Sequence, residues 1–273
     1  MRSVFATVVS AGLFAAASAQ AADIAAPVYK APVVAPAYSW TGWYGGISGG
    51  YGWGDPYVVV DPSTVPLPPS GQALSSFSAA DPFSIHTRPK GGFGGILLGY
   101  NAQFQAFVIG WEADFSFSGI RDTASGPFTN FAVFDTDTGS TNGLVTLETK
   151  LKWFGTVRGR WGFVVGTVMP YATGGLAYGK LENTVTSSAT QILNGANAGG
   201  YNLSATFSDT QLGYTVGGGF DWLIANNWLF RAEYLYFNLG GEDYVPALPA
   251  VTLLNTDFEM HIIRGALVFK FAP

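Results

Sequence analysis

The stretch covering residues 147–162 constrains the fold more than any other part of this 273-residue chain. Successive side chains of a β-strand point to opposite faces. Read in that way, LETKLKWFGTVRGRWG has one apolar face and one charged face, whereas a helix would spread its charges around the axis. The sequence therefore predicts a strand. Its apolar face would carry Leu147, Leu151, Trp153, Val157 and Trp161, and its charged face Glu148, Lys150, Lys152, Arg158 and Arg160.

A soluble sheet also buries one face, so alternation alone does not place this strand in a membrane. A transmembrane barrel has an apolar outer surface, a polar interior and aromatic residues at both interfaces. Only 11% of the residues are charged and 15% are aromatic. No apolar run outside the N-terminus reaches the length of a transmembrane helix. Together these features favour a membrane barrel.

The N-terminus has the pattern of an export signal. Residues 1–21 combine a basic Arg2, an apolar core and the small-residue sequence Ala19-Gln20-Ala21. We predict a signal peptide cleaved between Ala21 and Ala22. Residues 22–40 are rich in Pro and Ala and offer no periodic apolar face, which predicts an extended periplasmic tail. Residues 41–273 would form the barrel.

Seven further segments alternate like the first one. In residues 228–239, for example, Arg231 and Glu233 fall on the face opposite Phe230 and Tyr234. Long and short connections alternate, which is the connectivity of an up-and-down barrel. We predict an all-β fold, an eight-stranded antiparallel up-and-down transmembrane β-barrel with four long outer loops and short periplasmic turns. The strands would cover residues 42–53, 92–100, 107–117, 147–162, 171–182, 209–222, 228–239 and 256–271, and the long loops residues 55–90, 118–146, 183–208 and 240–255.

Charged residues of the predicted strands share the inward face. An eight-stranded barrel is just wide enough for side chains to fill it, which favours a packed charge network. A narrow ion path through the same residues is the alternative. The predicted interior charges are Glu112, Asp114, Glu148, Lys150, Lys152, Arg158, Arg160, Asp221, Arg231, Glu233, Arg264 and Lys270. The predicted aromatic girdle consists of Trp43, Trp53, Trp161, Trp222 and Trp228.

The chain offers little for catalysis. It has no cysteine and two histidines, His86 and His261. His86 lies near Asp81 and Ser84, but a predicted loop lacks the rigid support that a catalytic triad needs. We expect no enzyme, no cofactor and no metal site. The net charge of -5 argues against a nucleic-acid partner.

Short motifs in most of the predicted strands resemble a known family. They are WTGWYGG at residues 40–46, GYN at 99–101, GTVRGR at 155–160, PYATGG at 170–175, GYTVGGG at 213–219 and EYLY at 233–236. In this order they resemble the small outer-membrane immunogenic, or porin-family, proteins of alpha-proteobacteria, within the OmpA-like group of eight-stranded barrels. Such barrels usually end on an aromatic residue read by the assembly machinery, whereas here Ala272 and Pro273 follow Phe271.

The resemblance implies a structural protein of the cell outer membrane that exposes loops at the surface. The implied partners are outer-membrane lipid, lipopolysaccharide and the barrel assembly machinery, with surface partners of the loops. Two alternatives stay open at this point. One is a small porin that passes ions or small solutes, and the other, less favoured, is a lipid-modifying enzyme of the outer membrane.

Overall fold

The structure is a computed structural model that describes residues 38–61, 74–240, 252–254 and 258–271. The chain divides into two units, Met1–Ala37 and Tyr38–Pro273. The predicted signal peptide, its cleavage site at Ala21 and Ala22, and tail residues 22–37 lie outside the described residues, as do Ala272 and Pro273. Residues 38–40, assigned to the tail from the sequence, belong to the second unit. In the described part of the chain, no helix is long and apolar enough to cross a membrane.

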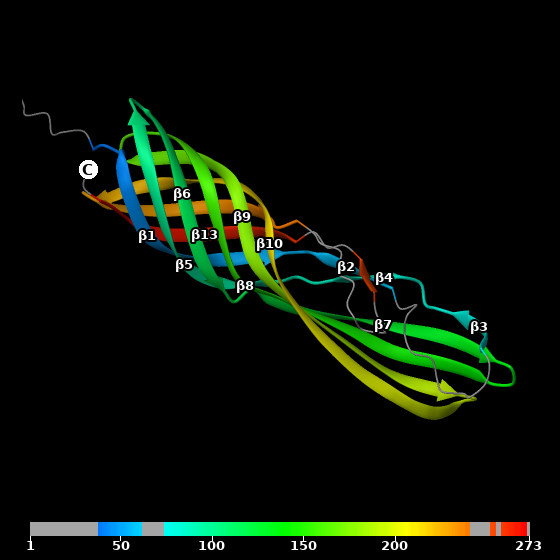
Figure 1. The fold of residues 1–273 in the computed structure, drawn as a ribbon. Helices are drawn as coiled ribbons and strands as arrows, with labels where there is room; N and C mark the ends of the chain where they lie inside the picture. The colour runs from blue at the N-terminus through cyan, green and yellow to red at the C-terminus, as the bar shows by residue number, and fades with distance from the viewer. Residues whose placement is uncertain (1–37, 62–73, 241–251, 255–257, 272–273) are drawn as a thin grey trace, which may run out of the picture. The chain divides into compact units, whose positions relative to one another are not determined.

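Eight strands of the second unit are hydrogen-bonded in a closed cycle, which we call the ring (Figure 1). Each strand is antiparallel to both of its neighbours, and the pairing of β1 with β5 closes the cycle. The predicted all-β antiparallel fold is confirmed. Around the ring, the strands are β1 (Gly42–Gly54), β13 (Glu259–Lys270), β11 (Trp228–Asn238), β10 (Ala196–Ala225), β9 (Val168–Leu193), β8 (Thr138–Phe163), β6 (Phe107–Ser118) and β5 (Lys90–Phe104).

Three short connections lie at one end of the ring, which we call the turn end. They are residues 105–106, 164–167 and 226–227, and they match the short turns that the sequence predicted. The start of β1 and the end of β13 lie at this end too, because Tyr44 is the register partner of Lys270. We call the opposite end the distal end.

At the distal end, β8, β9 and β10 continue past the ring. Asp122, Thr149, Asn183 and Phe207 are register partners and form one row across the strands. Beyond this row lies a sheet that we call the distal sheet. It consists of the continuing parts of β8, β9 and β10 together with β7 (Arg121–Phe134) and β3 (Leu74–Ser78).

The distal sheet corrects two of the four predicted long loops. Residues 118–146 and 183–208 are mostly strand, because their Ser and Thr side chains alternate along the backbone and pair across it. The hydroxyls of Ser125 and Thr146 lie 2.9 Å apart, and those of Thr184 and Thr206 lie 3.0 Å apart. Cross-strand hydroxyl pairs of this kind stabilise a sheet.

The other two predicted loops contain a second, small sheet. It consists of β12 (Thr252–Leu254), β2 (Tyr57–Asp61) and β4 (Phe83–His86), in that order. Val60 and Ile85 of this sheet are buried against one face of the distal sheet. Their apolar partners there are Phe128, Val145, Leu147 and Val185.

Candidate functional site

A β-bulge at Lys152 decides which side chains of β8 face the inside of the ring. Leu151 pairs with Leu181 and Trp153 with Lys180, so Lys152 is an extra residue in the ladder. A bulge of one residue shifts the alternation of the strand by one position. Arg158 and Arg160 therefore face inward, as predicted, and Trp153 faces outward. On the other side of the bulge, odd-numbered residues such as Leu151 are buried.

The same bulge makes three of the predicted interior charges wrong. Before Lys152, even-numbered residues of β8 point away from the interior. Lys150 pairs with Glu148, with Nζ 2.9 Å from Oε1, and both side chains are partly exposed. Lys152 pairs with Glu182 at 3.0 Å, also on the outer face. Alternation predicts the wrong face for these residues because nothing in the sequence marks the extra residue of the bulge.

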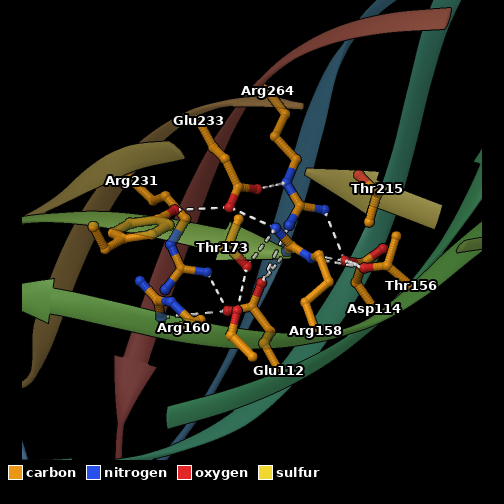
Figure 2. A network of polar contacts seen from close by, with 12 residues as sticks. Glu112, Asp114, Thr156, Arg158, Arg160, Thr173, Thr215, Arg231, Glu233 and Arg264 are labelled. Carbon is orange, nitrogen blue, oxygen red and sulfur yellow. Dashed lines mark hydrogen bonds and ion pairs between the residues drawn. The ribbon is translucent and has the colours of Figure 1, made fainter. Parts of the chain in front are cut away.

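Eight of the predicted charges come together as one network inside the ring, shown in Figure 2. Four guanidinium groups meet four carboxylates, so their formal charges balance. Their side chains are between 0% and 2% exposed. The members are Arg158, Arg160, Arg231, Arg264, Glu112, Asp114, Asp221 and Glu233.

Glu112 of β6 is the hub of this network. Its Oε1 accepts hydrogen bonds from Arg158 Nη2 at 2.7 Å and from Arg264 Nη2 at 3.1 Å. Its Oε2 accepts from Arg231 Nη1 and from Arg160 Nη1, the latter at 3.5 Å. One carboxylate thus contacts all four arginines.

The other three carboxylates complete the pairing. Asp114 Oδ2 accepts from Arg158 Nη2 at 3.2 Å and lies 3.1 Å from Arg264 Nη1. Asp221 accepts from Arg231 Nε at 2.6 Å and from Arg160 Nη2 at 2.8 Å. Glu233 accepts from Arg158 Nη1 at 2.8 Å and from Arg264 Nε at 2.5 Å. Such charge-assisted hydrogen bonds are the strong ones, and here each guanidinium uses several of its donors.

Uncharged side chains that the sequence analysis missed hold the network in place. The Tyr44 hydroxyl donates to Glu112 Oε2 at 2.9 Å, and the Tyr171 hydroxyl donates to Glu233 Oε1 at 2.9 Å. The guanidinium of Arg160 lies 3.9 Å from the centre of the Tyr171 ring. Tyr44 shares its alternation phase with Ser48 rather than with Trp43, and this was the signal that it points inward.

Apolar layers lie on both sides of the network. Along β11, inward residues run from Leu229 through Arg231 and Glu233 to Leu235 and Phe237. The strand therefore crosses an apolar layer at the turn end, then the charges, then a second apolar layer. The first layer includes Trp40, Leu97, Val108, Met169, Leu229 and Val268, and the second Phe93, Leu151, Phe154, Leu181, Phe237 and Met260.

Comparison with known proteins identifies the family. Residues 7–271 match the family described as outer membrane protein beta-barrel domain. The chain belongs to this family. It is 34% identical over 265 residues to the 31 kDa outer-membrane immunogenic protein of Brucella melitensis, covering 94% of this chain and 95% of that protein. It is 31% identical over 216 residues to the 22 kDa outer membrane protein of Rhizobium leguminosarum, covering 79% and 71% respectively.

A third relative, the 25 kDa outer-membrane immunogenic protein of Brucella abortus, is 29% identical over 268 residues, which is 97% of this chain and 96% of that protein. The resemblance inferred from the motifs is thereby confirmed. The chain is an outer-membrane β-barrel protein with a structural role in the cell envelope.

The predicted girdle residues of this outer-membrane protein lie on its outer surface. The five tryptophans are 36% to 58% exposed. Trp43, Trp161, Trp222 and Trp228 lie near the turn end, and Trp53 lies toward the distal end. Beside Trp53, at a ring-centre distance of 5.8 Å, lies His261, whose Nδ1 is 2.7 Å from the Tyr234 hydroxyl oxygen.

Lys270 and His86 lie apart from the charge network. Lys270 Nζ donates to the Ser39 carbonyl oxygen at the turn end and lies 5.0 Å from the centre of the Tyr38 ring. Burial, and to a lesser degree the charge of Asp221, raises the pKa of Tyr38 to about 12. His86 is exposed on β4, with Nδ1 3.9 Å from Asp55 Oδ1. In the described part of the chain Asp55, not Asp81, is the carboxylate within 4.0 Å of His86.

Proposed function

We propose that this protein is a closed eight-stranded up-and-down barrel that conducts no ions. Its role is to reinforce the envelope and to display the distal sheet outside the cell. The observation that carries this proposal is the balanced network of four arginines and four carboxylates, enclosed between two apolar layers. The turn end, with its short connections, would face the periplasm.

The burial of the charges argues against the porin alternative. A conducting interior keeps its charged groups hydrated, whereas these side chains are nearly inaccessible to water. A charge removed from water is tolerable only when it is paired and hydrogen-bonded, and here every member has a partner. Beyond the network, Phe154 lies against Phe93 and Phe237, with ring centres 5.1 and 5.4 Å away. This layer would have to part before an ion could pass.

We also propose that the protein is not an enzyme. The network carboxylates are paired with arginines and enclosed between two apolar layers, so a substrate could not reach one of them to use it as a base. Both histidines lie outside the ring interior, His86 on β4 and His261 on the outer surface. The surface most suited to partners is the outward face of the distal sheet, with its rows of Ser and Thr hydroxyls.

The test is single-channel conductance of the refolded mature protein in a planar bilayer. Folding is verified beforehand by the different gel mobilities of unheated and boiled samples. We expect no conductance steps from the wild type, and we expect Arg158→Ala to lower stability. Steady, salt-dependent steps that change in Arg158→Ala would contradict the proposal and support the porin alternative.

A further inference from the structure

The cations outside the network gather in one place. Apart from the network arginines and Lys270, every Lys and Arg of the described residues lies near the junction between the ring and the distal sheet. In register, Arg121 lies between Lys90 and Lys150, and Lys180 is the partner of Trp153 beside the bulge. Arg88, paired with Asp55 at 3.6 Å, lies just before β5. The others, on the outer face of four strands, form what we call the cation row: Lys90, Arg121, Lys150, Lys152 and Lys180.

The cation row lacks enough carboxylates to neutralise it. Glu148 and Glu182 pair with Lys150 and Lys152, so in the described part of the chain five cations face two anions and three positive charges remain. Among the described residues, no carboxylate lies within 4.0 Å of the charged groups of Lys90, Arg121 or Lys180. Like charges directly opposite each other on neighbouring strands are destabilising. Such an arrangement is relieved when an external anion binds between the cations.

A groove of about 500 Å³ lies in the middle of the cation row. It exists because β6 ends at Ser118 and β7 begins at Arg121, while the bulge at Lys152 interrupts the facing strand. Its lining consists of Ser118, Gly119, Ile120, Arg121, Lys150, Leu151 and Lys152. Three of the five cations thus border one opening.

The groove lies at the boundary between an apolar and a polar outer surface. Toward the turn end, the outer face carries Phe115, Phe117, Trp153 and Tyr178, whose rings contact one another. Toward the distal sheet, it carries the hydroxyl rows. Aromatic side chains gather where hydrocarbon meets headgroups. In the proposed orientation, the groove is therefore at the headgroup level of the outer leaflet.

We propose that this groove binds the phosphate groups of an anionic lipid headgroup, with Arg121 and Lys150 as the main ligands. The guanidinium of Arg121 suits a phosphate because it can donate two parallel hydrogen bonds. The acyl chains would lie over Phe117 and Trp153. We commit to a phosphorylated glycolipid of the outer leaflet, such as lipopolysaccharide, as the source of the phosphate. The inference rests on the proposed orientation of the barrel.

The experiment measures binding of fluorescent lipid A to the refolded mature protein in zwitterionic detergent. Arg121→Gln should weaken binding about tenfold, which corresponds to about 1.4 kcal/mol, because the charge-assisted hydrogen bonds to the phosphate are lost. Arg121→Lys keeps the charge but cannot donate two parallel hydrogen bonds, so its affinity for lipid A should lie between those of the wild type and Arg121→Gln. Arg88→Gln is the matched control, since it neutralises an exposed cation that is already paired with Asp55 and does not belong to the cation row, and it should bind like the wild type.

Two further probes identify the source of the phosphate. Dephosphorylated lipid A should bind the wild type and Arg121→Gln equally weakly, and inorganic phosphate alone should not compete at millimolar concentration. Equal binding of lipid A to wild type and Arg121→Gln would overturn the inference. So would undiminished binding of the dephosphorylated lipid. Full competition by inorganic phosphate would reassign the groove to free anions.

Folding and function are controlled separately. Within the described ranges Arg121 has no carboxylate partner, so Arg121→Gln should refold as well as the wild type in the absence of lipid. If it does not, Lys90→Gln, an exposed member of the row outside the groove lining, tests the same surplus of charge. Conductance is a separate measurement. If the protein conducts ions and its lipid A binding depends on Arg121, only the proposal of a sealed barrel is refuted. If it conducts no ions and its lipid A binding does not depend on Arg121, only the lipid site is refuted.

Discussion

At the scale of single residues, the interior depends on an exact count of charges. Glu112 contacts Arg158, Arg160, Arg231 and Arg264, and the eight members of the network sum to zero. Desolvating each of these ions costs several kcal/mol, which is offset only by partners and hydrogen bonds. Loss of one carboxylate would leave a net positive charge that water cannot stabilise, since apolar layers lie on both sides.

Glu112→Gln should therefore destabilise the protein strongly. Removing one partner of a buried ion pair typically costs about 3–5 kcal/mol. The measurement is urea unfolding in lipid vesicles, followed by tryptophan fluorescence. The matched control is Glu148→Gln, which removes a partly exposed partner of Lys150 on the outer face and should cost about 1 kcal/mol or less. Equal unfolding free energies for the two variants would show that the network does not stabilise the ring.

The sequence predicted much of this network but not its limits. Alternation identified the eight interior charges because every one of them lies in a strand with an apolar opposite face. It failed for Glu148, Lys150 and Lys152, which lie before or at a bulge that only backbone pairing reveals. It also missed Tyr44 and Tyr171. The alternation phase of Tyr44 does indicate an inward side chain. What alternation cannot show is that an uncharged residue belongs to the network, because the hydrogen bonds of Tyr44 to Glu112 and of Tyr171 to Glu233 depend on the folded geometry.

At the scale of elements, the bulge lets one long strand serve two cores. Before Lys152, β8 turns Val145 and Leu147 into the core between the distal sheet and the small sheet. After it, the strand turns Arg158 and Arg160 into the ring. Without the extra residue, one of these two sets would point the wrong way, because a slip of one position exchanges the two faces of a strand.

Deletion of Lys152 should accordingly prevent folding, whereas Lys152→Ala should not. The deletion forces either the arginines toward lipid or the leucines toward water. The substitution keeps the bulge and removes only an exposed ion pair with Glu182. The measurement is the fraction of refolded protein with heat-modifiable gel mobility. A deletion variant that refolds with wild-type yield would show that the bulge is dispensable.

The strands of the distal sheet are not predicted by composition. Residues 118–146 and 183–208 were predicted as loops because they are polar, yet polar Thr is a favourable strand residue. A usable signal was present at Asn194-Gly195, where φ values of 50° and 80° form the tight turn between β9 and β10. Asn-Gly between alternating segments is the strongest short-range signal of a β-hairpin. The small sheet had no comparable signal, since its strands are short and far apart in sequence.

At the scale of the whole second unit, the ring and the distal sheet have separate cores. The apolar clusters inside the ring share no residue with the cluster between the distal sheet and the small sheet. The strand pairings that close the ring also lie on the turn-end side of the row formed by Asp122, Thr149, Asn183 and Phe207. The ring should therefore fold without the sheet beyond that row, while the sheet depends on the ring to hold its strands in register.

A truncated variant tests this independence. Residues 123–148 and 184–206 are each replaced by Asn-Gly, which joins register partners through two-residue turns. Val60→Thr and Ile85→Thr are added because these side chains lose their apolar partners. We expect heat-modifiable gel mobility, as for the wild type, and the same cost of Glu112→Gln in both backgrounds, within about 0.5 kcal/mol, because independent sites are additive. A truncated chain that stays unfolded, or a Glu112→Gln cost that differs by more than this, would mean that the distal sheet is part of what holds the ring closed.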